Sequence, residues 1–97
     1  MKKTEAFVLV EKFCLSHGID ISFITALHNF GLIEIIVMEE NQYLSLGQIK
    51  DAERMIRLHY ELAVNLEGID IINNLLARIE NMQAELIAAQ NKLRLID

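Results

Sequence analysis

A stripe of apolar residues runs through the last third of the chain and sets the limits for any fold. From Ile72 onward its members recur alternately three and four positions apart. They are Ile72, Leu75, Ile79, Met82, Leu86, Ala89, Leu93 and Ile96. This spacing places them on one face of an α-helix and continues for more than three heptads. We therefore predict one long helix that starts near Asn65, a candidate N-cap, and reaches the C-terminus.

Such a helix is about 45 Å long at roughly 1.5 Å per residue, which is more than a head formed by residues 1–64 can cover. We predict a homodimer through this helix. The dimer contacts are Ile72, Leu75, Ile79, Met82, Leu86 and Leu93. With Ile72 at heptad position a, Arg78, Glu85 and Lys92 fall at g. Antiparallel pairing is favoured, because g positions then face g positions and Arg78 can meet Glu85 of the second copy. In a parallel pair, Arg78 and Glu85 would face glutamines instead. The alternative is a stripe that folds back on its own head.

The composition indicates one folding unit. A chain of 97 residues with 53% hydrophobic residues and no proline has enough apolar material for one modest core. We divide it into a head, 1–64, and a dimerisation helix, 65–97. The single Cys14 cannot form an internal disulfide, and an unpaired thiol is ordinary in the cytoplasm, where we expect the protein. The longest apolar runs are about five residues, so no signal peptide or membrane span is expected.

The head is expected to be mostly helical with a small β wing. Residues 7–10 are β-prone, 11–16 suit a helix, and Gly18 suits its left-handed end. Asp20 is a candidate N-cap for a second helix that runs to about Phe30 and stops at Gly31, with Ile24 and Leu27 facing inward.

A hairpin follows, with one strand over 32–38, a polar turn over 39–42 to which Asn41 is suited, and a second strand over 43–46. Ser45 and Gln48 have capping-box spacing and predict a third helix to about Val64. The apolar run 35–38 presents no polar face. We expect it to be buried under the C-terminal helix or the second copy, and the alternative is an exposed partner patch.

This order of elements, with the segment HGIDISFITALHNFGLIE, resembles the MerR-type winged helix-turn-helix over residues 7–64. A narrower set of residues is similar to the chaperone-modulator family. These are Glu11-Lys12-Phe13-Cys14-Leu15, Gly18-Ile19, Gly31-Leu32-Ile33, Arg57-Leu58, Glu61-Leu62-Ala63 and Gly68-Ile69. The resemblance implies a protein that binds the J-domain of a DnaJ-like, curved-DNA-binding co-chaperone and inhibits it.

The charge distribution agrees with a protein partner. The net charge is −5, and no Lys or Arg lies between Lys12 and Lys50. DNA readers of this fold need basic residues on the second helix and wing, because phosphate contacts supply most of the affinity. Here the second helix offers Ser22, Thr25, Ala26 and Asn29, and the wing offers Glu39, Glu40, Asn41 and Gln42. DNA binding is therefore disfavoured.

We predict that this acidic half docks on a basic J-domain surface. The predicted contacts are Asp20, Ile21, Phe23, Glu39 and Glu40, with Ile21 and Phe23 partly exposed. The alternative function is a dimeric transcription regulator that binds DNA through Lys50, Arg54 and Arg57 of the third helix. A third possibility is a purely structural dimerisation module.

Neither catalysis nor a cofactor is expected. No nucleophile, base and carboxylate occur at an informative spacing. Cys14 and His17 lie three apart and would need His28 or His59 to approach a metal site, which is too few convergent ligands. We interpret Cys14 as a core thiol and His17 as a turn residue.

Overall fold

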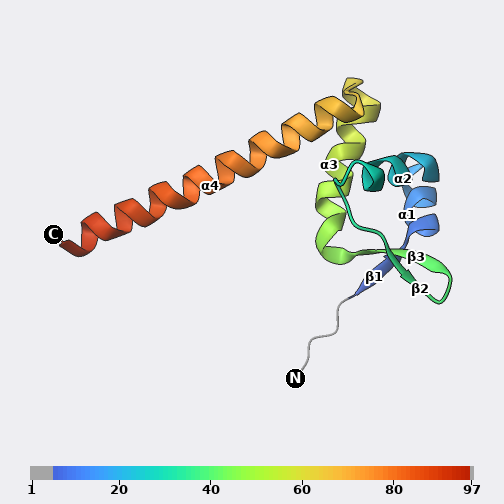
Figure 1. The fold of residues 1–97 in the computed structure, drawn as a ribbon, viewed down its shortest axis with the longest axis horizontal. Helices are drawn as coiled ribbons and strands as arrows, with labels where there is room; N and C mark the ends of the chain where they lie inside the picture. The colour runs from blue at the N-terminus through green and yellow to red at the C-terminus, as the bar shows by residue number, and fades with distance from the viewer. Residues whose placement is uncertain (1–5, 97) are drawn as a thin grey trace.

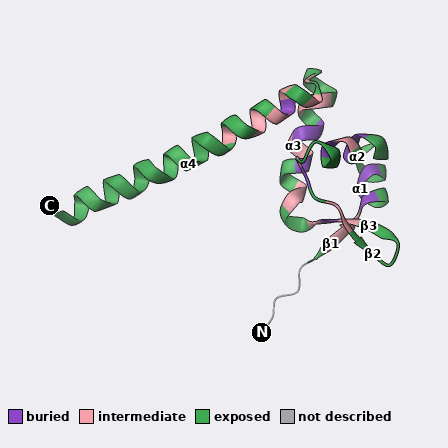
Figure 2. Ribbon diagram, in the orientation of Figure 1, coloured by how far each residue is buried: buried purple, intermediate pink, exposed green. Residues whose placement is uncertain are grey.

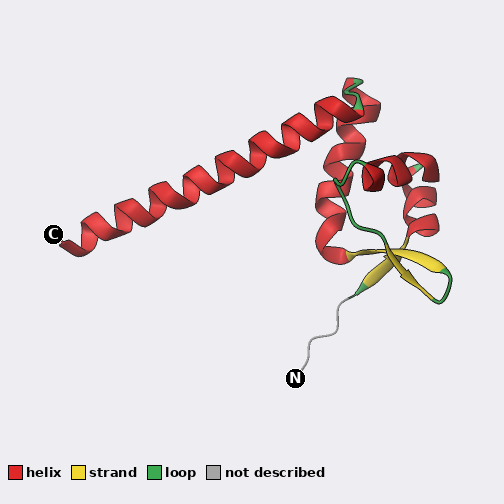
Figure 3. Cartoon of the chain, viewed as in Figure 1, coloured by secondary structure: helices red, strands yellow, loops and turns green. Residues whose placement is uncertain are grey.

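The computed structural model of the protein describes residues 6–96 and has seven elements (Figure 1). In chain order they are β1 (Phe7–Leu9), α1 (Val10–His17), α2 (Ile21–Asn29), β2 (Ile36–Met38), β3 (Asn41–Ser45), α3 (Leu46–Leu62) and α4 (Leu66–Ile96). Helices α1, α2 and α3 form a compact head with the small sheet, and α4 extends from this head (Figure 3). The predicted mostly helical fold with a β wing and a long C-terminal helix is confirmed. Residues 1–5 and 97 of the predicted head and helix lie outside the described residues.

Glycines end the first two helices as predicted. Gly18 has a φ of 67° and its N–H bonds the carbonyl oxygen of Leu15, which closes α1. Gly31, with a φ of 77°, follows α2. Asp20 occupies the N-cap position of α2, but its side chain makes no capping bond.

The three strands form an antiparallel sheet in the order β1-β3-β2. Val8 pairs with Leu44, and Val37 pairs with Gln42. This register puts the hairpin turn on Glu39 and Glu40, which have φ values of 50° and 69°. The turn therefore lies within the predicted range 39–42 but is shorter, because Asn41 and Gln42 pair with Met38 and Val37 in the ladder.

The first wing strand is shorter than predicted. It begins at Ile36, because the loop before it is held to α3 rather than to β3. The side-chain amide of Gln48 bonds both backbone groups of Glu34. Gln48 therefore does not complete a capping box with Ser45, which stands at the N-cap of α3 without a side-chain bond. The N-cap predicted for α4 is confirmed, since Asn65 Oδ1 accepts the Gly68 N–H at 2.8 Å.

One core joins the elements of the head (Figure 2). Its buried members are Val10, Phe13, Cys14, Phe23, Ile24, Leu27, Ile33, Leu44, Ala52, Met55, Ile56 and Ile69. The predicted burial of Ile24, Leu27 and Cys14 is confirmed. The predicted partial exposure of Phe23 is wrong, because its ring is 7% exposed and lies 4.6 Å from the ring of His59 on α3.

Helix α4 leaves the head beside the end of α3 and runs away from the wing (Figure 1). Of its residues, all within the described part of the chain, only Ile69 is buried. Met82 and Leu93 are 62% and 64% exposed, so the alternative in which the stripe folds back on its own head is wrong. The same chain's α4 does not cover the wing either, and Val37 is 63% exposed.

Candidate macromolecule-binding face

The outer surface of α2 and the β2–β3 hairpin form the candidate binding face of the head. Ile21, Ser22, Thr25 and Asn29 of α2 are exposed, and so are the side chains of the hairpin turn. Residues 13–49, which include both elements, contain no Lys or Arg. The only formal charges that the hairpin presents are the carboxylates of Glu39 and Glu40. The face is therefore acidic and repels polyanions at short range.

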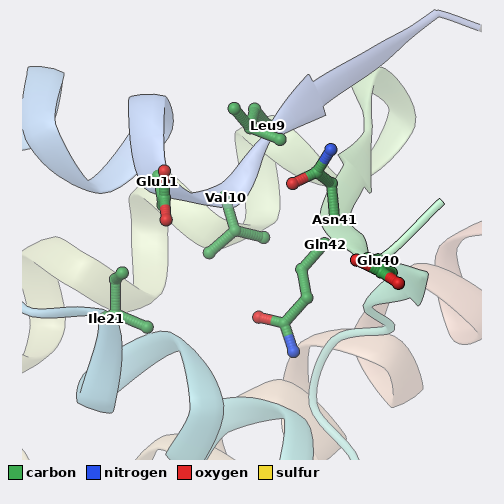
Figure 4. Close-up of a pocket in the computed structure, with 7 residues that line it drawn as sticks. All are labelled: Leu9, Val10, Glu11, Ile21, Glu40, Asn41 and Gln42. Atoms are coloured by element: carbon green, nitrogen blue, oxygen red, sulfur yellow. The ribbon is translucent and has the colours of Figure 1, made fainter. Parts of the chain in front are cut away.

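A cleft of about 150 Å³ lies between the hairpin turn and the starts of α1 and α2 (Figure 4). Its lining residues are Leu9, Val10, Glu11, Ile21, Glu40, Asn41 and Gln42. Val10 lies between the two walls, with Glu11 and Ile21 on one side and the hairpin residues on the other. Within residues 6–96, neither Glu11 nor Glu40 forms a salt bridge. The cleft thus combines the apolar side chains of Leu9, Val10 and Ile21 with two carboxylates from separate elements, which suits a cationic side chain with a long aliphatic stem.

Four of the five predicted partner contacts lie on the surface. Asp20, Ile21, Glu39 and Glu40 are exposed, and Ile21 shares the cleft with Glu40. Phe23 of α2 cannot contact a partner, since its ring packs against the rings of His59 and Tyr60 on α3.

Sequence reasoning missed Glu11 as a cleft residue. The pairing of Leu9 with Tyr43 brings the start of α1 next to the wing. No local sequence signal reports that proximity.

The three basic residues of α3 that were predicted to contact DNA are not all free to do so. Lys50 and Arg57 are exposed. Arg54 is engaged instead at the junction with α4, where it lies 3.2 Å from the Asp51 carboxylate and donates to Asn73 Oδ1 at 3.3 Å. Its Nε is buried without a partner. Arg54 therefore has a structural role in the α3–α4 junction and is poorly placed for phosphate.

The histidines and the cysteine lie apart from one another in the described part of the chain. In residues 6–96 no three His, Cys, Asp or Glu side chains are grouped to hold an ion. His17 Nε2 lies 3.1 Å from Glu53, whereas His28 and His59 lie next to the carbonyl oxygens of Ile33 and Val64. Burial, with a smaller contribution from the Asp20 charge, raises the pKa of the Cys14 thiol. A raised pKa keeps the thiol protonated and unreactive, as a core residue should be.

The apolar stripe of α4 forms a second surface. Near the middle of the helix, Ile79, Met82, Gln83 and Leu86 line a shallow groove of about 370 Å³. Leu75, Ile79, Met82, Leu86 and Leu93 are all exposed, and Ile72 is half-buried at the base of the helix.

A helix-turn-helix, a two-stranded wing and a long C-terminal helix define a winged helix-turn-helix of the MerR type. The comparison with protein families matches residues 8–91 to the family described as MerR HTH family regulatory protein, and the chain belongs to this family. No curated protein and no solved structure matches the chain significantly. None of the helices within residues 6–96 is both long and apolar enough to span a lipid bilayer.

Proposed function

We propose that the chain is a regulator whose head binds a basic protein domain through the acidic face of α2 and the hairpin. The J-domain of a DnaJ-like co-chaperone, implied by the resemblance to chaperone modulators, is the partner, and binding inhibits it. The observation that carries the proposal is the absence of Lys and Arg from this face together with the carboxylates of Glu11 and Glu40, which line its cleft.

The negative sign of the charge on this face favours a basic partner over DNA. A MerR-type head that reads DNA must neutralise phosphates, and each such contact contributes through counterion release. The face of this chain offers carboxylates at the wing tip instead, which oppose a phosphate backbone. The same charges steer and orient a basic partner, while Leu9 and Ile21 supply apolar contact area at the cleft.

A titration of the full chain with an isolated J-domain by calorimetry tests the proposal. We expect binding that weakens as the salt concentration rises, because screening reduces attraction between exposed charges. No binding at low salt would refute the proposal.

The matched variants are Glu11→Gln/Glu40→Gln in the cleft and Glu34→Gln/Glu61→Gln elsewhere on the head surface. Both change the net charge by the same amount. Only the cleft variant should weaken binding, by about tenfold. Equal losses in the two variants would mean that net charge alone, and not the cleft, determines the affinity.

DNA binding is the second candidate, and membership of the MerR family supports it more directly than it supports a J-domain partner. Lys50 and Arg57 are the exposed residues of α3 that are available for backbone contacts. A mobility-shift assay with the DNA upstream of the gene that encodes this chain decides between the two candidate functions. Sequence-specific retention at physiological salt, lost in Lys50→Ala/Arg57→Ala, would establish the transcription regulator.

A further inference from the structure

We propose that the outer face of the small sheet, rather than the outer surface of α2, is the main contact area for the basic partner of the head. This inference rests on the proposed function and names the residues that carry it. The strand register places five apolar side chains on the same face of the sheet, namely Phe7, Leu9, Ile36, Met38 and Tyr43. We call these five residues the wing face. The polar residues on this side of the sheet, Asn41 and Ser45, stand at the two ends of β3.

The opposite face of the sheet belongs to the core of the head. Leu44 is fully buried there, and Val8, its cross-strand partner, packs against the core cluster. The same cluster holds the inward side chains of α1, α2 and α3, so these helices lie on the core side of the sheet (Figure 3). The half-buried members of the wing face are not among the residues that pack against this cluster. Within residues 6–96, the wing face is therefore free to contact a partner.

Two aromatic rings form the centre of the wing face. Phe7 on β1 and Tyr43 on β3 lie edge to face, with their ring centroids 6.5 Å apart and an interplanar angle of 68°. Leu9 and Ile36 flank Tyr43 as its cross-strand partners. Each ring limits the movement of the other, which lowers the entropy lost when a partner orders them. Aromatic side chains at the centre of a contact area are the residues that most often carry its binding energy.

Carboxylates border the wing face. The charged residues of the hairpin and of the loop before it, residues 30–45, are all acidic, namely Glu34, Glu39 and Glu40. Glu34 comes two residues before Ile36, and the two others form the turn that joins β2 to β3. The wing face is also continuous with the cleft, because Leu9 belongs to the first and lines the second together with Glu40. An apolar centre and an acidic border thus lie side by side on one surface.

The sign of these charges determines which partner the wing face fits. A second copy of the chain would set one acidic border against another, and facing like charges oppose association. Single-stranded nucleic acid stacks on aromatic rings, but its phosphates would be repelled by the same carboxylates. A basic protein surface with aliphatic side chains between its Lys and Arg residues covers the rings at the centre and pairs with the carboxylates at the border. A cation of that surface that enters the cleft then lies beside Leu9, so one partner reaches both areas.

Binding of an isolated J-domain to the full chain, measured by surface plasmon resonance, tests the wing face. Phe7→Thr/Tyr43→Thr removes both rings and keeps residues that favour strands. We expect the affinity to fall by about thirtyfold, mainly through faster dissociation. The matched control is Ser22→Ala/Thr25→Ala on the exposed surface of α2, which should leave the affinity unchanged.

The salt dependence separates the wing face from the cleft. The loss caused by Phe7→Thr/Tyr43→Thr should be the same at low and at high salt, because it comes from lost apolar contact. The loss caused by Glu11→Gln/Glu40→Gln should shrink as the salt concentration rises, because screening already weakens those charges in the wild type. A loss in the ring variant that disappears at high salt would contradict an apolar contact through the rings.

Photo-crosslinking tests the same contact in a chain that keeps both rings. The photoreactive residue p-benzoylphenylalanine replaces either Met38 on the wing face or Thr25 on α2, and the J-domain should be captured from position 38 only. Capture from position 25 alone, or unchanged binding by a folded ring variant, would overturn the inference and leave the proposed function in place. A wild-type chain that does not bind the J-domain would refute both.

The other two occupants give results of their own. A lower oligomeric state in the ring variant than in the wild type, measured by sedimentation, would assign the wing face to a second copy of the chain. Retention of a single-stranded oligonucleotide that is lost in the ring variant would assign it to nucleic acid. Either result would overturn the inference.

Discussion

The side-chain amide of Gln48 bonds both backbone groups of Glu34. Its Oε1 accepts the Glu34 N–H at 2.7 Å, and its Nε2 donates to the Glu34 carbonyl oxygen at 2.8 Å. The loop between α2 and β2 is thereby fastened to the first turn of α3, although it contains no regular structure. This attachment positions the wing relative to α2 and so sets the shape of the candidate binding face.

Gln48→Ala should lower the free energy of unfolding by about 1–2 kcal/mol, because it removes two hydrogen bonds and leaves backbone groups of the loop without a protein partner. For a domain of this size the melting temperature falls by about 4–8 °C per kcal/mol. Thermal denaturation followed by circular dichroism measures the change. Gln48→Glu is the matched control, since it keeps one acceptor but loses the donor, and it should be destabilised as well. An unchanged melting temperature in both variants would show that the clamp does not contribute to stability.

Most of the fold could be predicted because its signals are local. The three-four spacing from Ile72 predicted α4, and Gly18 and Gly31 marked the ends of two helices. The errors share a different cause. Asn41 is a better intrinsic turn former than glutamate, yet the pairing of β2 with β3 takes Asn41 into the ladder and leaves the turn to Glu39 and Glu40. Gln48 looked like half of a capping box, but its partner lies 14 residues away in the chain.

The sequence alone indicates only part of the candidate binding face, for the same reason. Its lack of basic residues is visible in the sequence, and so are Asp20, Ile21 and the two glutamates of the wing. Phe23 was misplaced because its burial depends on His59 and Tyr60 of α3, which no local pattern connects to it. Tertiary contacts between distant segments therefore decide which of the candidate residues can reach a partner.

The turn of the wing carries two glutamates in a backbone conformation that glutamate disfavours. Glu39 and Glu40 both adopt left-handed backbone conformations, which cost about 1–2 kcal/mol for each side-chain-bearing residue. Replacing them by Glu39→Asn/Glu40→Gly should raise the free energy of unfolding by about 1 kcal/mol, because asparagine and glycine favour these φ values. Urea denaturation measures the gain.

The control for the turn is Glu39→Gln/Glu40→Gln, which removes the same charges and keeps the backbone strain. It should leave stability nearly unchanged. Both variants should weaken binding of the proposed basic partner to a similar extent, because both lack the wing carboxylates. If the asparagine-glycine variant is no more stable than the glutamine variant, the strain is absent.

Cys14 should make stability fall with rising pH in the alkaline range. Burial first, and the Asp20 charge second, raise the pKa of the folded thiol above its ordinary value of 9.0. Below about pH 9 the thiol is protonated in both states and contributes no pH dependence. Above that pH the unfolded thiol ionises while the folded one stays protonated, so stability is lost as the pH rises. Urea midpoints at pH 7 and pH 10 measure the loss.

Cys14→Ala separates this contribution from that of other alkaline groups. The difference between its midpoints at pH 7 and pH 10 should be smaller than in the wild type. Asp20→Asn should give an intermediate difference, because it removes only the electrostatic cause. The thiol should also react with a disulfide reagent much more slowly in the folded protein than in urea. Rapid modification of the native protein would contradict a protected Cys14.

The basic residues of α3 should differ in how much each contributes to stability. Arg54→Ala should lower the free energy of unfolding by about 1–2 kcal/mol, because it removes the bond to Asn73, the ion pair with Asp51 and the packing of its aliphatic stem at the α3–α4 junction. Lys50→Ala and Arg57→Ala change exposed side chains and should stay within about 0.5 kcal/mol of the wild type. Urea denaturation of the three variants measures this split.

The same variants bear on the DNA-binding alternative. If the chain binds DNA, Lys50→Ala and Arg57→Ala should each reduce the dependence of log affinity on log salt by about one unit, as loss of a phosphate contact requires. Arg54→Ala should leave that slope unchanged, since its guanidinium is engaged by Asp51 and Asn73 within the chain. A variant Arg54→Ala as stable as the wild type, with a reduced salt slope, would instead identify Arg54 as a phosphate contact. In that case Arg54 would not be the residue that stabilises the α3–α4 junction.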